Sequence, residues 1–316
     1  MIKTAEVVTP RHPDKICDRI SDAILDACLE QDSDSRVAIE TMGGHGIITI
    51  TGELTTKAFV DVPEIVKRVY GKDIGVQTNI VRQSPEIAQG VDTGGAGDQG
   101  IMIGYACNDN EEFVPQEYYL ARKLAQHIYE KYPFDGKTQV TMNGNSLRVV
   151  ASFCCTPTSV LRDLVVEFFD QYPEYRIEDL HCNPAGDWSL GGFDADAGLT
   201  GRKLAVDNYG PRVPLGGGAF SGKDASKVDR SAAYMARRIA VDYLKEYKAN
   251  EVFVQLAYAI GYDKPIQATA IVDGSTTVIR SYDLSPKGII KFLDLKKPVF
   301  SKTAEWGHMG NNFKWL

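Results

Sequence analysis

Pro214-Leu215-Gly216-Gly217-Gly218-Ala219-Phe220-Ser221-Gly222-Lys223-Asp224 is a glycine-rich loop that leads into a helix. Three consecutive glycines permit positive φ and a close backbone approach to a ligand, and successive N–H groups in such a loop can surround an anion. Apolar residues then recur at helical spacing from Val228 to Leu244. We expect Ser226 to cap this helix, with Asp229 completing a capping box. The loop would thus meet a helix N-terminus, where anions are favoured.

Positive charges beside this loop indicate which kind of anion it would bind. Lys223, Lys227 and Arg230 follow the glycines, so the stretch predicts a polyphosphate site. A P-loop is disfavoured because its eighth position must be Ser or Thr, whereas Asp224 stands there, and because 208–214 is a turn-rich connection rather than a buried strand. A surface glycine turn before a capped helix is the other alternative, and the lysines count against it.

Composition limits the class of protein. The chain has 316 residues, of which 43% are hydrophobic, and a formal net charge of −7. This balance disfavours general binding to nucleic acid, and no apolar run is long enough to span a membrane. The six cysteines show no Cys-x-x-Cys spacing, so we expect reduced, mostly buried thiols in a cytoplasmic protein. Cys154 and Cys155 are interpreted as core-strand thiols, with a redox-active pair as the alternative.

A repeated order of elements predicts the fold. Strand pairs are expected at 36–41 with 46–52, at 138–142 with 147–155, and at 251–261 with 265–272, and a helix follows each pair. Further helices are expected from Pro13 to Ala27, over 115–132 and after Ser226. The sequence therefore predicts an α+β fold of three similar sheet-and-helix domains in a pseudo-threefold arrangement. We place them at 1–92, 93–190 and 191–316, as domains that can exchange segments.

One glycine motif is rejected. Gly95-Ala96-Gly97-Asp98-Gln99-Gly100 matches G-x-G-x-x-G, but the residues after it are typical of a strand rather than a helix, so it is not a dinucleotide site. The polar stretch 83–97 is interpreted as a loop that can move over a site.

Several motifs together resemble the S-adenosylmethionine synthetase family. They are His12-Pro13-Asp14-Lys15, the 94–100 glycine motif, Gly198-Leu199-Thr200-Gly201-Arg202-Lys203, the loop 216–224 and Lys227-Val228-Asp229-Arg230, in the family's order. The resemblance implies a dimer or a dimer of dimers with active sites shared between subunits. It also implies that methionine sulfur attacks the ribose C5′ of ATP and displaces triphosphate, which is then hydrolysed to pyrophosphate and phosphate. Mg²⁺, two ions per site, and K⁺ are the implied metals.

The resemblance assigns roles position by position. Catalytic roles fall to His12, Lys137, Arg202, Lys203, Lys223 and Lys227. ATP contacts are implied for His12, Asp135, Lys137, Trp188, Asp196, Arg202, Lys203, Ala219 and Lys223. Methionine contacts are implied for Glu53, Gln83, Asp98, Asp196 and Lys227. Asp14 and Asp229 would hold Mg²⁺ and Glu40 would hold K⁺.

The chain also departs from the family pattern. It is shorter than typical members, and the 83–97 loop is trimmed. Asp187-Trp188 stands where the family has Arg-Phe, so a positive charge is missing while the aromatic ring is kept. Two other functions remain as alternatives to an active synthetase. One is a P-loop-like NTPase, and the other is a silent relative that serves as an assembly or regulatory subunit, against which the retained charged residues count.

Overall fold

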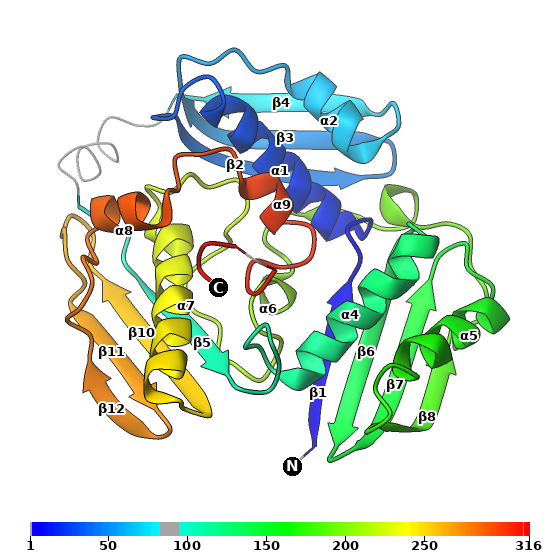
Figure 1. The fold of residues 1–316 in the computed structure, drawn as a ribbon. Helices are drawn as coiled ribbons and strands as arrows, with labels where there is room; N and C mark the ends of the chain where they lie inside the picture. Colours follow the sequence, from blue (N-terminus) through cyan, green and yellow to red (C-terminus); the bar gives the residue numbers. More distant parts are fainter. Residues whose placement is uncertain (1, 83–94, 312) are drawn as a thin grey trace.

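The computed structural model describes residues 2–82, 95–311 and 313–316. Within these ranges it is a mixed α+β fold with three sheets of four strands each, which confirms the predicted fold class. Figure 1 shows three units of sheet and helices arranged around the C-terminal segment. No helix in the described ranges is both long and apolar enough to cross a membrane.

The first sheet has the strand order β9-β2-β3-β4. Its strands are β2 (Arg36–Gly44), β3 (Ile47–Thr55), β4 (Gly75–Val81) and the short β9 (Gly198–Leu199). The β2–β3 hairpin turns at His45 and Gly46, both with positive φ, as the sequence predicted. Helix α2 (Val62–Tyr70) links β3 to β4, which therefore run parallel. Helix α1 (Pro13–Leu29) packs on β2.

The second sheet repeats this plan with the order β1-β6-β7-β8. Its strands are β1 (Lys3–Val8), β6 (Gly136–Asn143), β7 (Ser146–Phe153) and β8 (Arg176–Cys182). Helix α4 (Gln116–Lys131) packs on β1 and β6, and α5 (Thr158–Phe169) links the parallel strands β7 and β8. The β6–β7 hairpin turns at Gly144, as its Asn-Gly signal predicts.

The third sheet, with the order β12-β11-β10-β5, ends differently. Its strands are β5 (Gly100–Cys107), β10 (Glu251–Tyr258), β11 (Gln267–Val272) and β12 (Ser275–Val278). Asp273 and Gly274, both with positive φ, join β11 directly to β12, so this last pair is antiparallel. Helix α7 (Val228–Tyr247) packs on β5 and β10, and α8 (Pro286–Leu293) follows the sheet.

Each sheet contains one strand from another part of the chain. Strand β1 precedes α1 but pairs with β6, β5 precedes α4 but pairs with β10, and β9 precedes α7 but pairs with β2. The ranges 1–92, 93–190 and 191–316 thus exchange one strand each in a cycle. The remaining short elements are η1 (Gly192–Asp194), α6 (Leu204–Asp207) and α9 (Phe300–Thr303).

Helix α1 carries four buried aspartates at four-residue spacing, a pattern that places them on one helix face. Asp14 accepts a hydrogen bond from Leu199 N (2.9 Å) and Asp18 from Gly201 N (2.8 Å). Asp22 accepts from Gly222 N (2.8 Å), and Asp26 accepts from Phe300 N (3.0 Å) and Ser301 N (2.8 Å). This aspartate ladder fastens α1 to segments far along the chain and positions the loops of the site.

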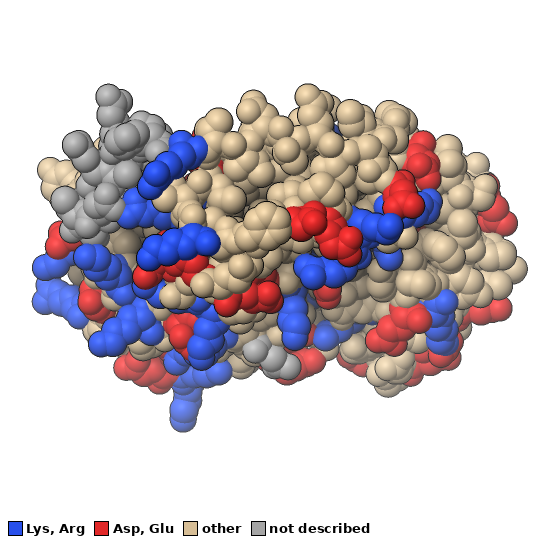
Figure 2. Space-filling model, turned by 90° about the horizontal axis from the view of Figure 1, so that it is seen from above, with Lys and Arg blue, Asp and Glu red and all other residues tan. Residues whose placement is uncertain are grey.

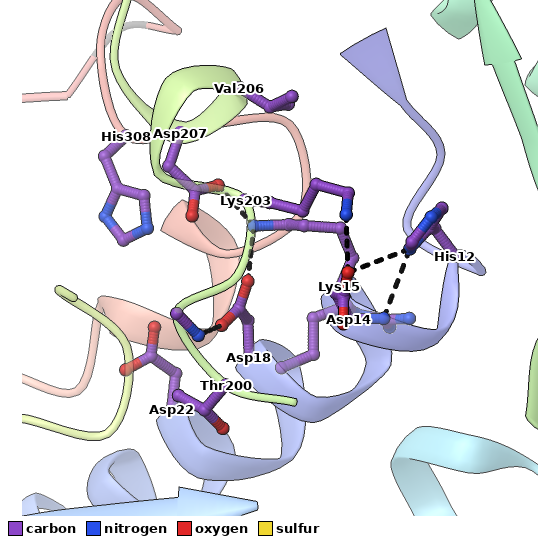
Figure 3. Close-up of polar contacts among 12 residues, drawn as sticks. His12, Asp14, Lys15, Asp18, Asp22, Thr200, Lys203, Val206, Asp207 and His308 are labelled. Carbon is purple, nitrogen blue, oxygen red and sulfur yellow. Dashed lines mark hydrogen bonds and ion pairs between the residues drawn. The ribbon is translucent and has the colours of Figure 1, made fainter. Parts of the chain in front are cut away.

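Two buried ion-pair groups reinforce the aspartate ladder. Lys15 Nζ lies between the carboxylates of Asp18 and Asp207, so its pKa is raised despite the opposing effect of burial, and Figure 3 shows these three side chains together. Asp22 and Arg230 pair with both side chains inaccessible to solvent. Charges in such surroundings remain favourable only when they are paired and hydrogen-bonded.

The predicted start of α7 is wrong by one residue, and the prediction that Ser226 caps the helix is also wrong. The helix begins at Val228 with Lys227 at the N-cap position and no side-chain cap. The Ser226 hydroxyl has no hydrogen-bond partner within the described part of the chain. Asp229 does not complete a capping box because its carboxylate binds Gly218 N and Lys223 Nζ instead.

The core-strand interpretation of Cys154 and Cys155 is also wrong. Strand β7 ends at Phe153, so both cysteines follow it in a turn. Cys154 is buried but Cys155 is exposed, whereas the other four cysteines are buried. All six lie in the described ranges and are free thiols.

Candidate active site

A first group of site residues gathers at the start of α1. His12 caps the helix, and its Nδ1 accepts a hydrogen bond from Asp14 N (3.2 Å). Asp14 Oδ2 lies 2.5 Å from Lys203 Nζ, and its Oδ1 lies 3.5 Å from Arg202 Nε. Figure 3 shows His12, Asp14 and Lys203 converging there. We call this group, with Arg202 and Lys137, the His12 cluster.

The electrostatics of the His12 cluster suit an anion. Burial lowers the pKa of His12 to about 4, assisted by the positive charges of Lys203 and Lys137, so the imidazole is neutral at pH 7. Burial would raise the pKa of Asp14, but the hydrogen bonds from Lys203 and Leu199 outweigh it and the pKa is lowered. Lys137 Nζ, on β6, is half exposed and 3.4 Å from Glu6.

A second group lies on the outer face of the first sheet. Val37 and Ile39 are buried against α1, so the alternate residues Ala38 and Glu40 face outward. Glu53 is paired with Ala38 across β2 and β3. Lys223 forms a single β-bridge with Ala38, and its Nζ lies 2.8 Å from Asp229 Oδ2. We call Glu40, Glu53, Lys223 and Asp229 the Lys223 cluster.

Charges within the Lys223 cluster influence one another. Burial raises the pKa of Glu40, Lys223 opposes this effect, and Glu53 adds to it. Glu40 and Glu53 beside Lys223 make a site that can accept a cation near the two glutamates and an anion near the lysine.

The glycine loop departs from the predicted open anion nest. The N–H group of Gly218 donates to Asp229 Oδ1 (2.9 Å), and that of Gly222 donates to Asp22 Oδ1 (2.8 Å). Gly222 has a φ of +81°, and a Cβ there would lie 2.0 Å from the carbonyl oxygen of Ile39. The glycines therefore allow the loop to lie against β2, and these two amides are already bonded to carboxylates.

Lys227 belongs to neither cluster. Its ammonium group is paired with Asp224, which also accepts a hydrogen bond from Val37 N (2.7 Å). Asp224 lines a pocket of about 290 Å³ together with Arg36 and Lys287.

A second pocket of about 330 Å³ lies beside Asp135, and Gly191, Gly192, Arg11 and Tyr70 also line it. Burial raises the pKa of Asp135, although its Oδ2 accepts a hydrogen bond from Gly192 N (2.9 Å). The described residues that line this pocket do not include Trp188.

Asp187 stands where the family pattern has arginine, and its side chain caps a helix. Its Oδ1 accepts hydrogen bonds from Thr158 N (2.9 Å) and Thr158 Oγ1 (2.5 Å). Pro157, at the N-cap position of α5, provides no side-chain cap. Asp187 therefore caps α5 from a distant part of the chain.

The other predicted residues are dispersed. Ala219 packs against Gly201, where a Cβ would lie 2.5 Å from the Ala219 Cβ. Asp196 is exposed and close enough to His12 to influence its pKa. Asp98 is exposed two residues before Gly100, which neighbours Asp229. Gln83 lies outside the described residues.

The two clusters contact α1 at different points. Asp14 contacts Lys203 of the His12 cluster, whereas Asp22 contacts Gly222, next to Lys223. These aspartates are eight residues apart, which corresponds to about 12 Å along a helix axis. Sequence reasoning missed Asp18 and Asp22, although their four-residue spacing is visible in the sequence.

The carboxylates predicted to hold metals are also apart, with Asp14 in one cluster and Asp229 and Glu40 in the other. No group of three or more His, Cys, Asp or Glu side chains in the described ranges is arranged to hold a metal ion. Mg²⁺ commonly takes one or two carboxylates and completes its shell with water and substrate phosphates. Asp14 and Asp229, each beside a lysine, therefore fit a metal ion that arrives with a polyphosphate.

Surface charge is unevenly spread. Figure 2 shows Lys and Arg side chains gathered towards one side of the molecule, next to a broad area with few charged side chains. The negative net charge of −7 thus coexists with local positive regions.

Comparisons with known proteins agree with these motifs. Family models described as the N-terminal, central and C-terminal domains of S-adenosylmethionine synthetase match residues 1–91, 93–152 and 190–316. The S-adenosylmethionine synthase of Clostridium tetani is 40% identical over 370 residues, covering 97% of this chain and 93% of the relative. That alignment is longer than the 316 residues of this chain, so the relative carries segments that are absent here. The chain belongs to the S-adenosylmethionine synthetase family.

Proposed function

We propose that this chain is a methionine adenosyltransferase that forms S-adenosylmethionine from ATP and L-methionine. The observation that carries the proposal is the family match over residues 1–91, 93–152 and 190–316, which together include both clusters. In the proposed reaction the methionine sulfur attacks the ribose C5′ and releases triphosphate, which the enzyme hydrolyses to pyrophosphate and phosphate. A thioether sulfur is already nucleophilic, so the protein's task is to orient the reactants and stabilise the leaving group.

His12 has the protonation state that this leaving group requires. Its Nδ1 accepts a hydrogen bond from Asp14 N, so the single proton of the neutral ring lies on Nε2. In our proposal Nε2 donates to the oxygen that leaves C5′. Lys203, Arg202 and Lys137 compensate the charge that develops on the triphosphate, and Lys223 holds its phosphates.

Members of this family use a divalent and a monovalent metal ion, which we propose are Mg²⁺, two per site, and K⁺. Asp14 and Asp229 would hold Mg²⁺, and Glu40 would hold K⁺. The divalent ion would neutralise charge on the triphosphate oxygens.

Substrate contacts complete the proposal. Asp135, Ala219 and Trp188 would contact the nucleotide, with Asp196 between the ribose and methionine. Glu53, Gln83, Asp98 and Lys227 would contact methionine.

The outer face of the first sheet supports a shared active site. Met42, Ile47, Val81 and Leu199 are 56%, 49%, 54% and 37% exposed, and the strand register places them on the face that bears Glu40 and Glu53. Exposed apolar areas beside polar groups mark interaction sites. We propose a homodimer or homotetramer in which a second copy covers this face and its His12 cluster completes the site of the Lys223 cluster.

The setting that we propose is the cytoplasm, with no nucleic-acid or membrane partner. The free state of all six cysteines, each within the described ranges, supports a reducing compartment.

Product analysis tests this function. Purified protein is incubated with ATP, Mg²⁺ and K⁺, with and without methionine, and the products are separated. The proposal predicts methionine-dependent S-adenosylmethionine with equal amounts of pyrophosphate and phosphate. ADP formed without methionine would favour the NTPase alternative, and binding of ATP without turnover would favour a silent subunit.

A further inference from the structure

Two neighbouring thiols meet just beyond β7. Cys154 Sγ and Cys155 Sγ are 3.5 Å apart, with Cys154 buried and Cys155 exposed. Cys155 has a φ of +56°, a conformation that is uncommon for residues other than glycine. Such backbone outliers concentrate at functional sites. A vicinal pair with one accessible sulfur is suited to oxidation.

The same thiols touch the segment before Gly192. Cys155 N donates a hydrogen bond to the carbonyl of Trp188 (2.8 Å), and Cys155 Sγ lies 3.6 Å from that of Ser189. Cys154 Sγ is so close to Gly191 that a Cβ there would lie 3.0 Å from it. Both cysteines line the 330 Å³ pocket beside Asp135, so a change in either sulfur changes the wall of that pocket.

We propose that Cys154 and Cys155 form a reversible oxidation site, at which a hydroperoxide closes a vicinal disulfide that weakens nucleotide binding. The effect on nucleotide binding rests on the proposed function, but disulfide formation does not. The Cys155 thiolate attacks the peroxide and forms a sulfenic acid as the O–O bond breaks and the other oxygen leaves as water or an alcohol. The Cys154 sulfur then attacks that sulfenic sulfur, an S–S bond forms, and water leaves with the Cys154 proton. Two thiols are oxidised by two electrons in all, and the peroxide is reduced.

The surroundings of the two sulfurs are consistent with this order. Burial raises the pKa of Cys154 to about 12, and neighbouring Cys155 adds to the effect. The thiolate is the nucleophile, so the accessible Cys155 reacts first and Cys154 resolves the product. Adjacent Cα atoms are about 3.8 Å apart across a trans peptide, below the usual disulfide range of about 4.4–6.8 Å, and such geometry makes a disulfide easier to reduce.

Peptide mapping tests the site itself. The intact protein is treated with hydrogen peroxide, digested with trypsin without reductant and analysed by mass spectrometry. The 149–162 peptide holds both sulfurs and no other cysteine, and it should lose about 2 Da, a change that dithiothreitol reverses. A sulfinic acid at Cys155, or a disulfide to another peptide, would overturn the proposal.

A binding measurement tests the consequence. Isothermal titration with the ATP analogue adenylyl imidodiphosphate should show an affinity about threefold weaker or more after oxidation, restored by dithiothreitol. Cys155→Ser is the matched control, because its side chain is exposed and it removes the disulfide; its affinity should not respond to peroxide. A disulfide in the wild type without a change in affinity would refute the link to the pocket. Failure of methionine-dependent turnover in the reduced protein would refute the proposed function. Peptide mapping would still test the disulfide, and the titration would still test its effect on binding of the ATP analogue.

Discussion

Asp22 on α1 and Arg230 on α7 form a bidentate ion pair, with Nη1–Oδ1 at 2.6 Å and Nη2–Oδ2 at 2.9 Å. Both side chains are inaccessible to solvent. Asp22 also accepts from Gly222 N (2.8 Å), so one carboxylate fixes both the helix and the glycine loop. Arg230 additionally donates to the carbonyls of Phe220 and Lys223. The position of the Lys223 cluster therefore depends on this buried contact.

Replacing Asp22 should be costly for stability. Asp22→Asn leaves the buried guanidinium without its charge partner, and breaking such a pair typically costs about 3–5 kcal/mol. Urea unfolding of the two proteins measures the difference. Asp34→Asn is the matched control because the Asp34–Lys296 pair is exposed, and loss of a surface pair costs less than about 1 kcal/mol. Equal effects of the two substitutions would contradict the role of Asp22.

His12 should make stability depend on pH. Its folded-state pKa of about 4 lies below the ordinary value of 6.5, so the unfolded chain takes up the proton first as pH falls. Stability is therefore lost as the pH is lowered from 6.5 to about 4, by roughly 2–3 kcal/mol at most for this group. Urea unfolding of metal-free protein at pH 7 and 4.5 should show a smaller loss in His12→Asn than in the wild type. Identical losses would show that His12 is not the responsible group.

Bound triphosphate should raise the pKa of His12. The positive charges of Lys203 and Lys137 help to depress this pKa, and an anion between them would offset their effect. NMR titration of ¹⁵N-labelled histidines, with His12→Asn to assign the signal, measures the change. A pKa that stays at about 4 when triphosphate is bound would count against contact between His12 and the leaving group.

Asp187 should contribute to stability rather than to nucleotide binding. Asp187→Ala removes the cap on Thr158 and should lower the temperature of unfolding, whereas Asp187→Asn keeps an acceptor and should lower it less. Thermal unfolding and KM for ATP separate the two roles. A KM that rises in Asp187→Ala without any loss of stability would show that Asp187 acts at the nucleotide instead.

Local signals in the sequence were sufficient for most helices and hairpins. His45-Gly46 and Asn143-Gly144 mark tight turns, in which His45, Gly46 and Gly144 have positive φ, and α1, α2 and α8 follow their apolar spacing. Strands β1, β4, β8, β9 and β12 were missed. All of these except β12 are held by partners distant in the chain, and such pairing is decided by tertiary packing rather than by local preference.

The sequence predicted which residues belong to the site but not which of them lie together. The motifs name charged residues such as Asp14 and Lys203, and the structure brings these two together. The sequence did not indicate that Asp229 would bind Gly218 N instead of capping its own helix. It also did not separate the His12 cluster from the Lys223 cluster, because their distance depends on where the aspartate ladder of α1 holds each loop.

The central claim is that one active site combines the His12 cluster of one copy with the Lys223 cluster of another. Lys203→Ala and Lys223→Ala should each reduce kcat by about 100-fold, on the scale of removing one charge-stabilising donor. The two variants are then co-expressed with different tags, and the mixed oligomer is isolated by purification on both tags. A mixed dimer holds one doubly altered site and one intact site.

The measurement is methionine-dependent formation of S-adenosylmethionine by that mixed oligomer. The account predicts recovery of about half of the wild-type activity, because one of two sites is restored. A mixed oligomer that forms but remains as inactive as its parents would contradict the account, since both clusters would then serve the same chain.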